Sequence, residues 1–177
     1  LRLGPVRECT LEANPDDLSP ERLEAWRSLG VGRLSLGVQS FDDAVLAALG
    51  RLHSGVEALR AIERAQAAGF DNLTIDLIYG WVGQSERSFV QDLERVRALG
   101  LRHVSVYGLS LEPATKLYRQ RARGQQVQVD DDTMADRFEQ VSAVLGPEYL
   151  HYEVSNHAQA GHFGLHNSSY WLGARYL

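Results

Sequence analysis

The stretch LGVGRLSL at residues 29–36 carries a pattern that returns twice, as AGFDNLTI at 68–75 and as LGLRHVSV at 99–106. In each copy, a glycine precedes an apolar run rich in β-branched residues by the same spacing. Such a glycine is typical of a helix that ends in a left-handed residue, and the run after it is typical of a buried parallel strand. The three copies are therefore predicted to be joints between a helix and a strand.

Apolar residues at helical spacing occupy the segments between these joints and are expected to face a sheet. One stripe is Val56, Leu59 and Ile62, and the next is Phe89, Leu93 and Val96 with the flanking Leu99. The first helix is predicted to begin with Ser19 as N-cap and Pro20, to turn Leu23 and Trp26 inward and to end at Gly30. With a strand around residues 9–12, at least four strands alternate with helices. The predicted class is α/β with a parallel sheet, and a repeat of roughly 30 to 40 residues suits a (β/α) barrel as well as a doubly wound sheet.

The pattern changes after Gly124. The acidic residues 130–132 are expected to start a helix whose apolar stripe ends at Gly146. That stripe consists of Met134, Phe138, Val141 and Leu145. A short strand is predicted at residues 149–154, and we interpret residues 155–177 as a loop with a short strand or helix.

Composition excludes several classes of protein. The chain has 177 residues, a hydrophobic fraction of 44% and a net charge of -5, so it has enough apolar residues for one core but no basic stripe for nucleic acid. No apolar run approaches the roughly 20 residues of a membrane span, and we expect a soluble, cytoplasmic protein. The one cysteine, Cys9, excludes an internal disulfide and a multi-cysteine metal site. Because the chain starts with Leu1 and ends without a polar tail, we expect it to be a fragment of a longer protein.

Polar residues follow the predicted strands, where a parallel sheet collects its ligand-binding groups. They are Glu12, Gln39, Ser40, Asp76, Tyr79, Tyr107 and Ser110. The carboxylate of Asp76 lies within an apolar run and needs a hydrogen-bonding partner. Either it caps a neighbouring loop or it binds a ligand, and its coincidence with Glu12 and Gln39 favours the ligand.

Two other groups give weaker signals. The segment from Gly80 to Ser85 has the form of a strand-turn-helix loop, but its glycine spacing fits neither a P-loop nor a dinucleotide fingerprint. The residues His157, His162 and His166 suggest metal ligands, yet their spacing suits no zinc pattern. Solvent-exposed histidines are the alternative interpretation.

Several strings nevertheless resemble the oxygen-independent coproporphyrinogen III oxidase-like radical-SAM family, over nearly the whole chain. They are LEANP at 11–15, RLSLGVQSF at 33–41, LGRLH at 49–53, DLIYG at 76–80, SVYGLSLEP at 105–113 and HNSSYW at 166–171. The last string, HNxxYW, resembles the heme-chaperone branch of this family, the HemW type.

This resemblance implies a partial (β/α) barrel at 1–125, and a segment at 126–177 that leads into a C-terminal domain. It implies that Glu12 contacts the ribose of S-adenosylmethionine, and that Gln39, Arg51, Asp76 and Ser110 complete that cofactor site. It further implies heme as a ligand, with His166 as the axial residue, and a heme-accepting protein as a possible partner. The implied function is heme binding and transfer. The alternatives are oxidative decarboxylation of coproporphyrinogen III and a small metabolic enzyme with Glu12 and Asp76 as acid and base.

The chain departs from the family pattern at three places. The CxxxCxxC loop that holds the 4Fe-4S cluster and the glycine-rich strand end after it are both absent, and Cys9 cannot replace three thiolates. We therefore expect the cluster only in an intact protein. The family's Gly-Leu-Pro-Gly-Gln reads Gly80-Trp81-Val82-Gly83-Gln84, which puts a bulky ring beside the expected cofactor mouth. The family's Glu-Pro-Gly-Thr carries Ala114 instead of glycine, which is unfavourable if that position needs a positive φ.

Overall fold

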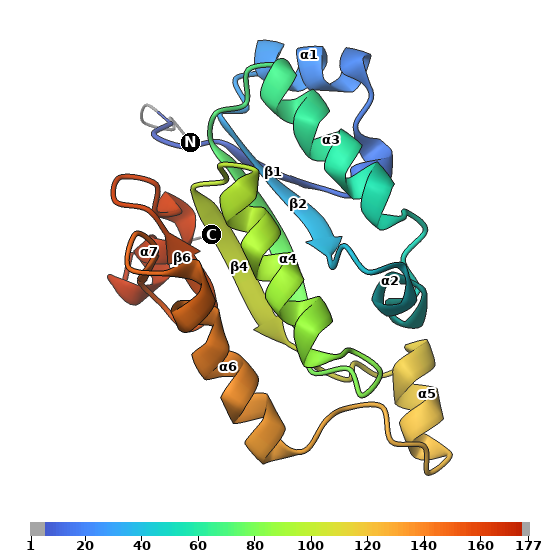
Figure 1. Ribbon diagram of the computed structural model, residues 1–177. Coiled ribbons are helices and arrows are strands. Elements are labelled where there is room, and N and C mark those ends of the chain that lie inside the picture. The colour runs from blue at the N-terminus through green and yellow to red at the C-terminus, as the bar shows by residue number, and fades with distance from the viewer. Residues whose placement is uncertain (1–5, 175–177) are drawn as a thin grey trace.

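The computed structural model describes residues 6–174 and has a single six-stranded sheet with the strand order β1-β2-β3-β4-β6-β5 (Figure 1). The strands are β1 (Thr10–Ala13), β2 (Arg33–Gln39), β3 (Leu73–Tyr79), β4 (His103–Gly108), β5 (Leu150–His151) and β6 (Asn156–Ala158). Strands β1 to β4 are parallel, and β6 is antiparallel to both β4 and β5. The predicted α/β class is thus confirmed, as a mostly parallel sheet.

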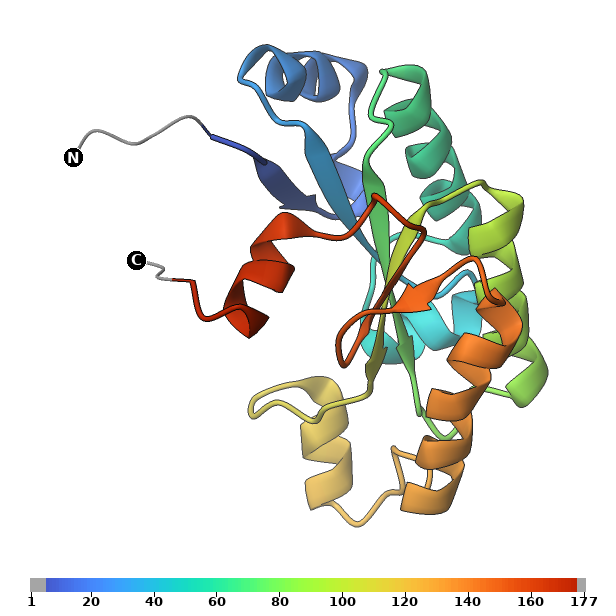
Figure 2. The ribbon, with the colours of Figure 1, turned by 90° about the vertical axis from the view of Figure 1, so that its left-hand side faces the viewer.

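The helices follow the strands in the order that the sequence indicates. They are α1 (Pro20–Ser28), α2 (Asp43–Leu49), α3 (Gly55–Ala67), α4 (Glu86–Ala98), α5 (Lys116–Ala122), α6 (Asp131–Leu145) and α7 (Leu165–Trp171), with a 3-10 turn η1 (Pro15–Asp17) after β1. Helices α3, α4 and α6 lie on one side of the sheet and α7 lies on the other (Figure 2). Among the described residues, no helix is both long and apolar enough to cross a lipid bilayer.

The three predicted joints are confirmed. Each joint glycine adopts a positive φ, from +65° at Gly100 to +87° at Gly30, and a strand begins within four residues of it. Ser19 caps α1 by accepting a hydrogen bond from Arg22 N, as expected from the sequence. Helix α6 ends at Gly146, as predicted.

The core lies between the sheet and the helices α3 and α4. In two helices, the buried residues differ from the predicted apolar stripe. The contact face of α3 consists of Ala58, Ala61, Ile62 and Ala65, whereas Val56 is 55% exposed. The alanines allow the helix to approach the sheet closely, so the apolar spacing around Val56 was misleading. In α6, Phe138 is 42% exposed and stands edge-on to His151, while Val141 and Leu145 are buried. The stripe of Phe89, Leu93 and Val96 in α4 is buried as predicted.

Three elements differ from the sequence prediction. The helices α2 and α5 were not predicted, since each spans only seven residues. The strand predicted at 149–154 is limited to β5, and the chain then turns back into β6, which adds an antiparallel strand next to β4. The HNxxYW segment forms α7, which agrees with the short strand or helix expected within residues 155–177.

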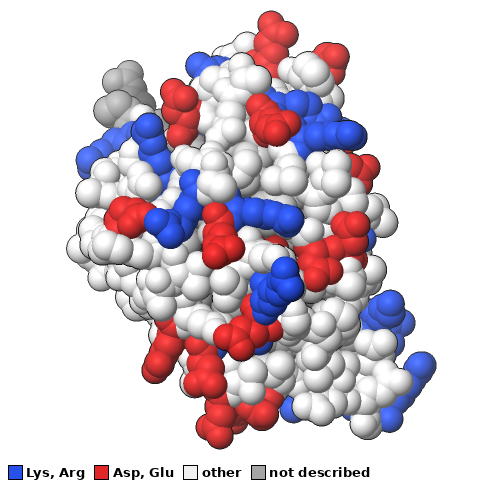
Figure 3. Space-filling view, in the orientation of Figure 1, with Lys and Arg blue, Asp and Glu red and all other residues white. Residues whose placement is uncertain are grey.

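The face seen in Figure 3 mixes acidic and basic side chains. Acidic groups gather at the lower left, over the beginning of α6, where Asp130 is the N-cap and Asp131 and Asp132 form the first turn.

Candidate functional site

A polar cavity of about 510 Å³ lies between the sheet and α7. The sheet contributes alternate residues of four neighbouring parallel strands, since successive side chains of a strand point to opposite faces. They are Thr10 and Glu12 of β1, Arg33 and Ser35 of β2, Thr74 and Asp76 of β3, and His103, Ser105 and Tyr107 of β4. The opposite wall includes Gly164, His166 and Asn167.

The strand register places Glu12 and Asp76 in neighbouring rows of the sheet, because Ser35, the partner of Glu12, pairs with Thr74 and not with Asp76. Glu12 pairs with Ser35 across β1 and β2, and Asp76 pairs with Ser105 across β3 and β4. The Ser35 hydroxyl donates to Asp76 Oδ1 over 3.3 Å. Glu12 and Asp76, which the sequence analysis expected to converge, share one cavity.

Asp76 has an unusual protonation equilibrium. Burial, the largest cause, raises its pKa to about 6, and the nearby charge of Glu12 acts in the same direction. Hydrogen bonds with Ser105 and Ser35 and the charge of Arg51 oppose that rise in pKa. A carboxyl group that titrates near neutrality in a polar cavity is typical of a ligand-binding or catalytic position.

Gln39 and Arg51 lie at the carboxyl ends of β1 and β2, beside Asn14. Gln39 is buried in a positive-φ conformation (+68°), where the pairing of β2 with β3 shifts its register. A Cβ on Gly37 would lie 2.9 Å from Gln39 Nε2 and 3.4 Å from Asn14 Oδ1, so a larger residue there would displace the amide of Gln39. Arg51 Nη1 donates to Asn14 Oδ1 over 3.1 Å. Neither Gln39 nor Arg51 lines the cavity, but Arg51 is near enough to affect the pKa of Asp76.

Three residues chosen at strand ends lie outside the cavity. Tyr79 is on the helix-facing side of β3, where its ring packs against Phe89 at a centroid distance of 5.4 Å. Ser40 is buried and donates to the Asp92 carboxylate over 2.5 Å. The expectation that Tyr79 and Ser40 face the ligand was wrong. It was based on their positions near the strand ends and did not consider that successive side chains of a strand point to opposite faces. Ser110 is exposed in the loop after β4.

The loop from Gly80 to Ser85 has a structural explanation. The Gln84 side chain accepts from Gly80 N and donates to the Ile78 carbonyl, both over 3.2 Å. A Cβ on Gly83 would collide with the ring of Trp81. That ring packs against the small cluster of Leu109, Leu117 and Val127 and does not line the cavity.

Ala114 has a φ of +70°, so this position does require the left-handed conformation for which the family pattern has glycine.

The three histidines of the C-terminal segment occupy different environments. His157 is buried in β6 and stacks on His151 at a centroid distance of 4.2 Å, and burial lowers its pKa to about 4. The interpretation of His157 as solvent-exposed was therefore wrong. His162 is partly buried beside Arg102. Across residues 6–174, no three His, Cys, Asp or Glu side chains come together in a way that could hold a metal ion.

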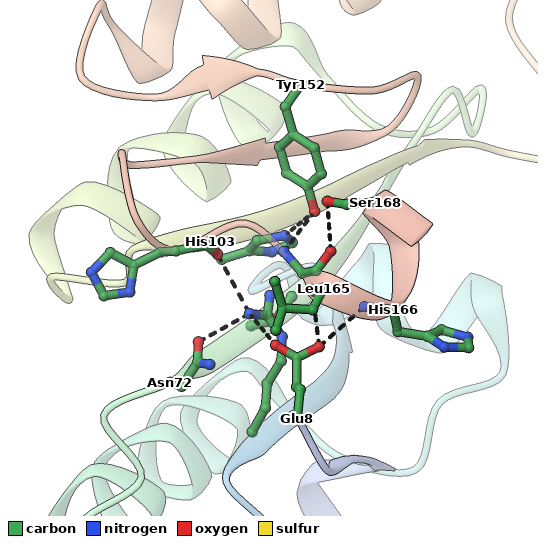
Figure 4. A network of polar contacts seen from close by, with 11 residues as sticks. Glu8, Asn72, His103, Tyr152, Leu165, His166 and Ser168 are labelled. Atoms are coloured by element: carbon green, nitrogen blue, oxygen red, sulfur yellow. Dashed lines mark hydrogen bonds and ion pairs between the residues drawn. The ribbon is translucent and has the colours of Figure 1, made fainter. Parts of the chain in front are cut away.

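His166 is exposed in the first turn of α7, at the edge of the cavity. Its Nε2 is 2.9 Å from the hydroxyl of Tyr170, one helical turn further on. The start of α7 is tied to the sheet by a polar network around Glu8, Arg33, His103 and Tyr152 (Figure 4). Sequence reasoning missed these four residues, and the one available signal was the cation Arg33 at the head of a buried strand.

The family follows from a comparison with known proteins. The model of the radical SAM superfamily matches residues 1–96, which is more than half of the chain. The chain belongs to the radical SAM superfamily. It is 40% identical over 177 residues to the heme chaperone HemW of Lactococcus lactis, covering 99% of this chain and 47% of that protein.

Two further similarities agree with this family. The mitochondrial radical S-adenosyl methionine domain-containing protein 1 of Mus musculus is 38% identical over 171 residues, covering 96% of this chain and 39% of that protein. The solved structure of coproporphyrinogen III oxidase from Escherichia coli, a radical SAM enzyme, superposes with a TM-score of 0.76 at 24% identity, covering 94% of this chain and 38% of that one. At this identity the superposition shows the fold alone. The chain spans about half the length, or less, of the relatives it matches.

The superfamily implies two groups, S-adenosylmethionine and a 4Fe-4S cluster. The residues of this chain suit the first group but not the second. A 4Fe-4S cluster is held by cysteine thiolates, and the chain contains one cysteine, partly buried Cys9. The cluster therefore does not fit these residues. The carboxylates and hydroxyls of the cavity, with Arg51 near them, do suit a polar, charged ligand such as S-adenosylmethionine.

Proposed function

We propose that this chain forms part of a HemW-type heme chaperone, and that it binds S-adenosylmethionine and heme at neighbouring positions. The observation that carries the proposal is the shared cavity, in which Glu12 and Asp76 of the sheet lie opposite His166 and Asn167 of α7. The identity of 40% to HemW of Lactococcus lactis over almost the whole chain supports the same conclusion. As part of this proposal, residues 1–125 form the partial barrel and residues 126–177 lead into a further domain.

The S-adenosylmethionine part of the site uses groups of opposite charge. Glu12, a hydrogen-bond acceptor that lines the cavity from the edge strand β1, suits the ribose hydroxyls. Arg51 presents a guanidinium group, whose paired donors suit a carboxylate such as that of the methionine moiety. Asp76 provides a further hydrogen-bonding group inside the cavity, and in this proposal the buried amide of Gln39 and the exposed Ser110 complete the site from outside its lining. S-adenosylmethionine would supply the reactive group of a radical SAM protein, but we attribute no electron-transfer step to these residues because they hold no cluster ligands.

The heme part of the site depends on His166. Its imidazole is exposed and borders the cavity, so a planar ligand can reach it. To ligate iron through Nε2, the imidazole must exchange its hydrogen bond with the Tyr170 hydroxyl. Asn167 lines the same cavity, and Trp171 is 64% exposed on the same helix, where its face can pack against a porphyrin.

Titration with hemin tests the proposal. If His166 is the axial ligand, His166→Ala should abolish or shift the Soret band while the melting temperature stays close to that of wild type. His162→Ala, a change four residues earlier, should leave the band intact. An unchanged band in His166→Ala would reject the ligand role, and a large loss of stability would assign His166 to the scaffold. Conversion of coproporphyrinogen III into porphyrin product would instead favour the oxidase alternative.

A further inference from the structure

The first turn of α7 is held by a residue that lies more than 150 positions earlier in the chain. Glu8 Oε1 accepts a hydrogen bond from Leu165 N over 3.0 Å and another from His166 N over 3.2 Å. The free backbone N–H groups at a helix start favour a carboxylate there. The imidazole of His166 points away from this carboxylate, so Glu8 fixes the backbone of His166 and does not contact its ring (Figure 4).

Glu8 is in turn fixed by a buried cation. Its Oε2 is 3.9 Å from Nη1 of Arg33, and the side chains of Glu8 and Arg33 are 12% and 4% exposed. Arg33 Nη2 donates to Thr74 Oγ1 over 2.7 Å and Nη1 donates to Asn72 Oδ1 over 3.0 Å. The Glu8 carboxylate therefore connects α7 to strands β2 and β3 through a guanidinium group that is itself anchored.

A second contact holds the same turn from the other side. The Tyr152 hydroxyl accepts from Gly164 N over 3.1 Å and lies 2.7 Å from His103 Nε2. Burial lowers the pKa of His103 to about 3, so its ring is neutral and Nε2 can accept the tyrosine proton. Consecutive backbone amides of residues 164–166 are thus occupied by groups from outside α7.

We propose that Glu8 is the positioning residue of α7: its carboxylate fixes the first turn of that helix, and with it His166, at the edge of the cavity that Glu12 and Asp76 line. Glu8 lies four residues before Glu12, so a single short segment contributes both to the sheet side of the cavity and to the position of its opposite wall. For the heme readout this inference rests on the proposed role of His166.

Hydrogen exchange of residues 164–171 tests the inference without any ligand. Glu8→Ala removes both acceptors, and exchange of α7 should become about tenfold to hundredfold faster. Glu8→Asp keeps the negative charge beside Arg33, but its side chain is one methylene too short to reach α7. Its α7 amides should therefore also exchange about tenfold to hundredfold faster than those of wild type. This variant provides the test if Glu8→Ala does not fold. Glu8→Gln keeps an acceptor of the same length and should restore most of the protection. Glu63→Ala, an exposed glutamate on α3, is the matched control and should exchange like wild type.

The same variants are then titrated with hemin. Glu8→Asp should weaken hemin binding or shift the Soret band, and Glu8→Gln should behave like wild type. Unchanged exchange of α7 in Glu8→Asp overturns the inference. Where His166→Ala changes the Soret band, an altered α7 with an unchanged band in Glu8→Asp overturns it as well. If wild type and His166→Ala show the same spectrum, the proposed function fails, whereas the exchange result still decides whether Glu8 holds α7.

Discussion

Ala114 is the residue at which one substitution is expected to stabilise the protein. It is exposed, precedes the N-cap of α5 and has a φ of +70°. A left-handed conformation costs an L-residue about 1–2 kcal/mol, and glycine loses about 0.5–1 kcal/mol more chain entropy on folding than alanine. The difference predicts that Ala114→Gly raises the free energy of unfolding by about 0.5–1 kcal/mol.

The matched control is the same substitution in a right-handed helix. Ala135 is exposed in the interior of α6, where Ala135→Gly should lower the free energy of unfolding by about 0.5–1 kcal/mol. Urea denaturation of both variants measures these changes, and calorimetry should show opposite shifts of the melting temperature of about 1–4 °C each. If Ala114→Gly is destabilised in the same way as Ala135→Gly, the backbone at residue 114 is not strained and the reasoning fails.

Three further predictions concern the cavity and the cluster. Asp76→Ala should weaken S-adenosylmethionine binding about tenfold to hundredfold in calorimetry, whereas Asp71→Ala, an exposed residue just before β3, should not; equal affinities would remove Asp76 from the site. Because burial raises the pKa of Asp76 to about 6, its contribution to stability is fully present below the unfolded pKa of about 3.9 and is lost as pH rises through 6. Wild type should therefore lose about 1–3 kcal/mol more than Asp76→Asn between pH 4 and pH 7 in denaturation curves, and parallel curves would contradict the assignment. Anaerobic reconstitution of the chain with iron and sulfide should leave no 4Fe-4S absorbance after desalting, since Cys9 is its only cysteine.

Local signals predicted most of the fold. The joint glycines and the apolar runs after them were sufficient for three of the four parallel strands, because helix ends and buried strands each leave a signature within about ten residues. Val56 shows where this reasoning fails. Its apolar side chain fits the helical spacing, yet alanines form the contact with the sheet, and small residues give little signal in a hydrophobic pattern.

The candidate site was predictable where chemistry and strand position coincide. Asp76 was identifiable because a carboxylate inside an apolar run requires a partner, and the structure places it with Glu12 in one cavity. Tyr79 lies three residues further along the same strand, on the opposite face. Position along a strand therefore does not identify a ligand-facing residue unless the alternation of side chains is counted from a known inward residue.

Contacts between distant segments explain the rest of what the sequence did not show. Arg51 has no periodicity that distinguishes it from other surface arginines, and its position near Asp76 depends on the turn after α2 and on Asn14. Glu8 is a more extreme case, because its partners Leu165 and His166 are brought to it by the antiparallel return of β6 and the loop after it. Because that segment returns to the sheet, Glu8, which belongs to no local sequence pattern, contacts both walls of the cavity. The site is thus formed by the sheet and by a late segment together, and substitutions at either end of the chain are expected to affect the same cavity.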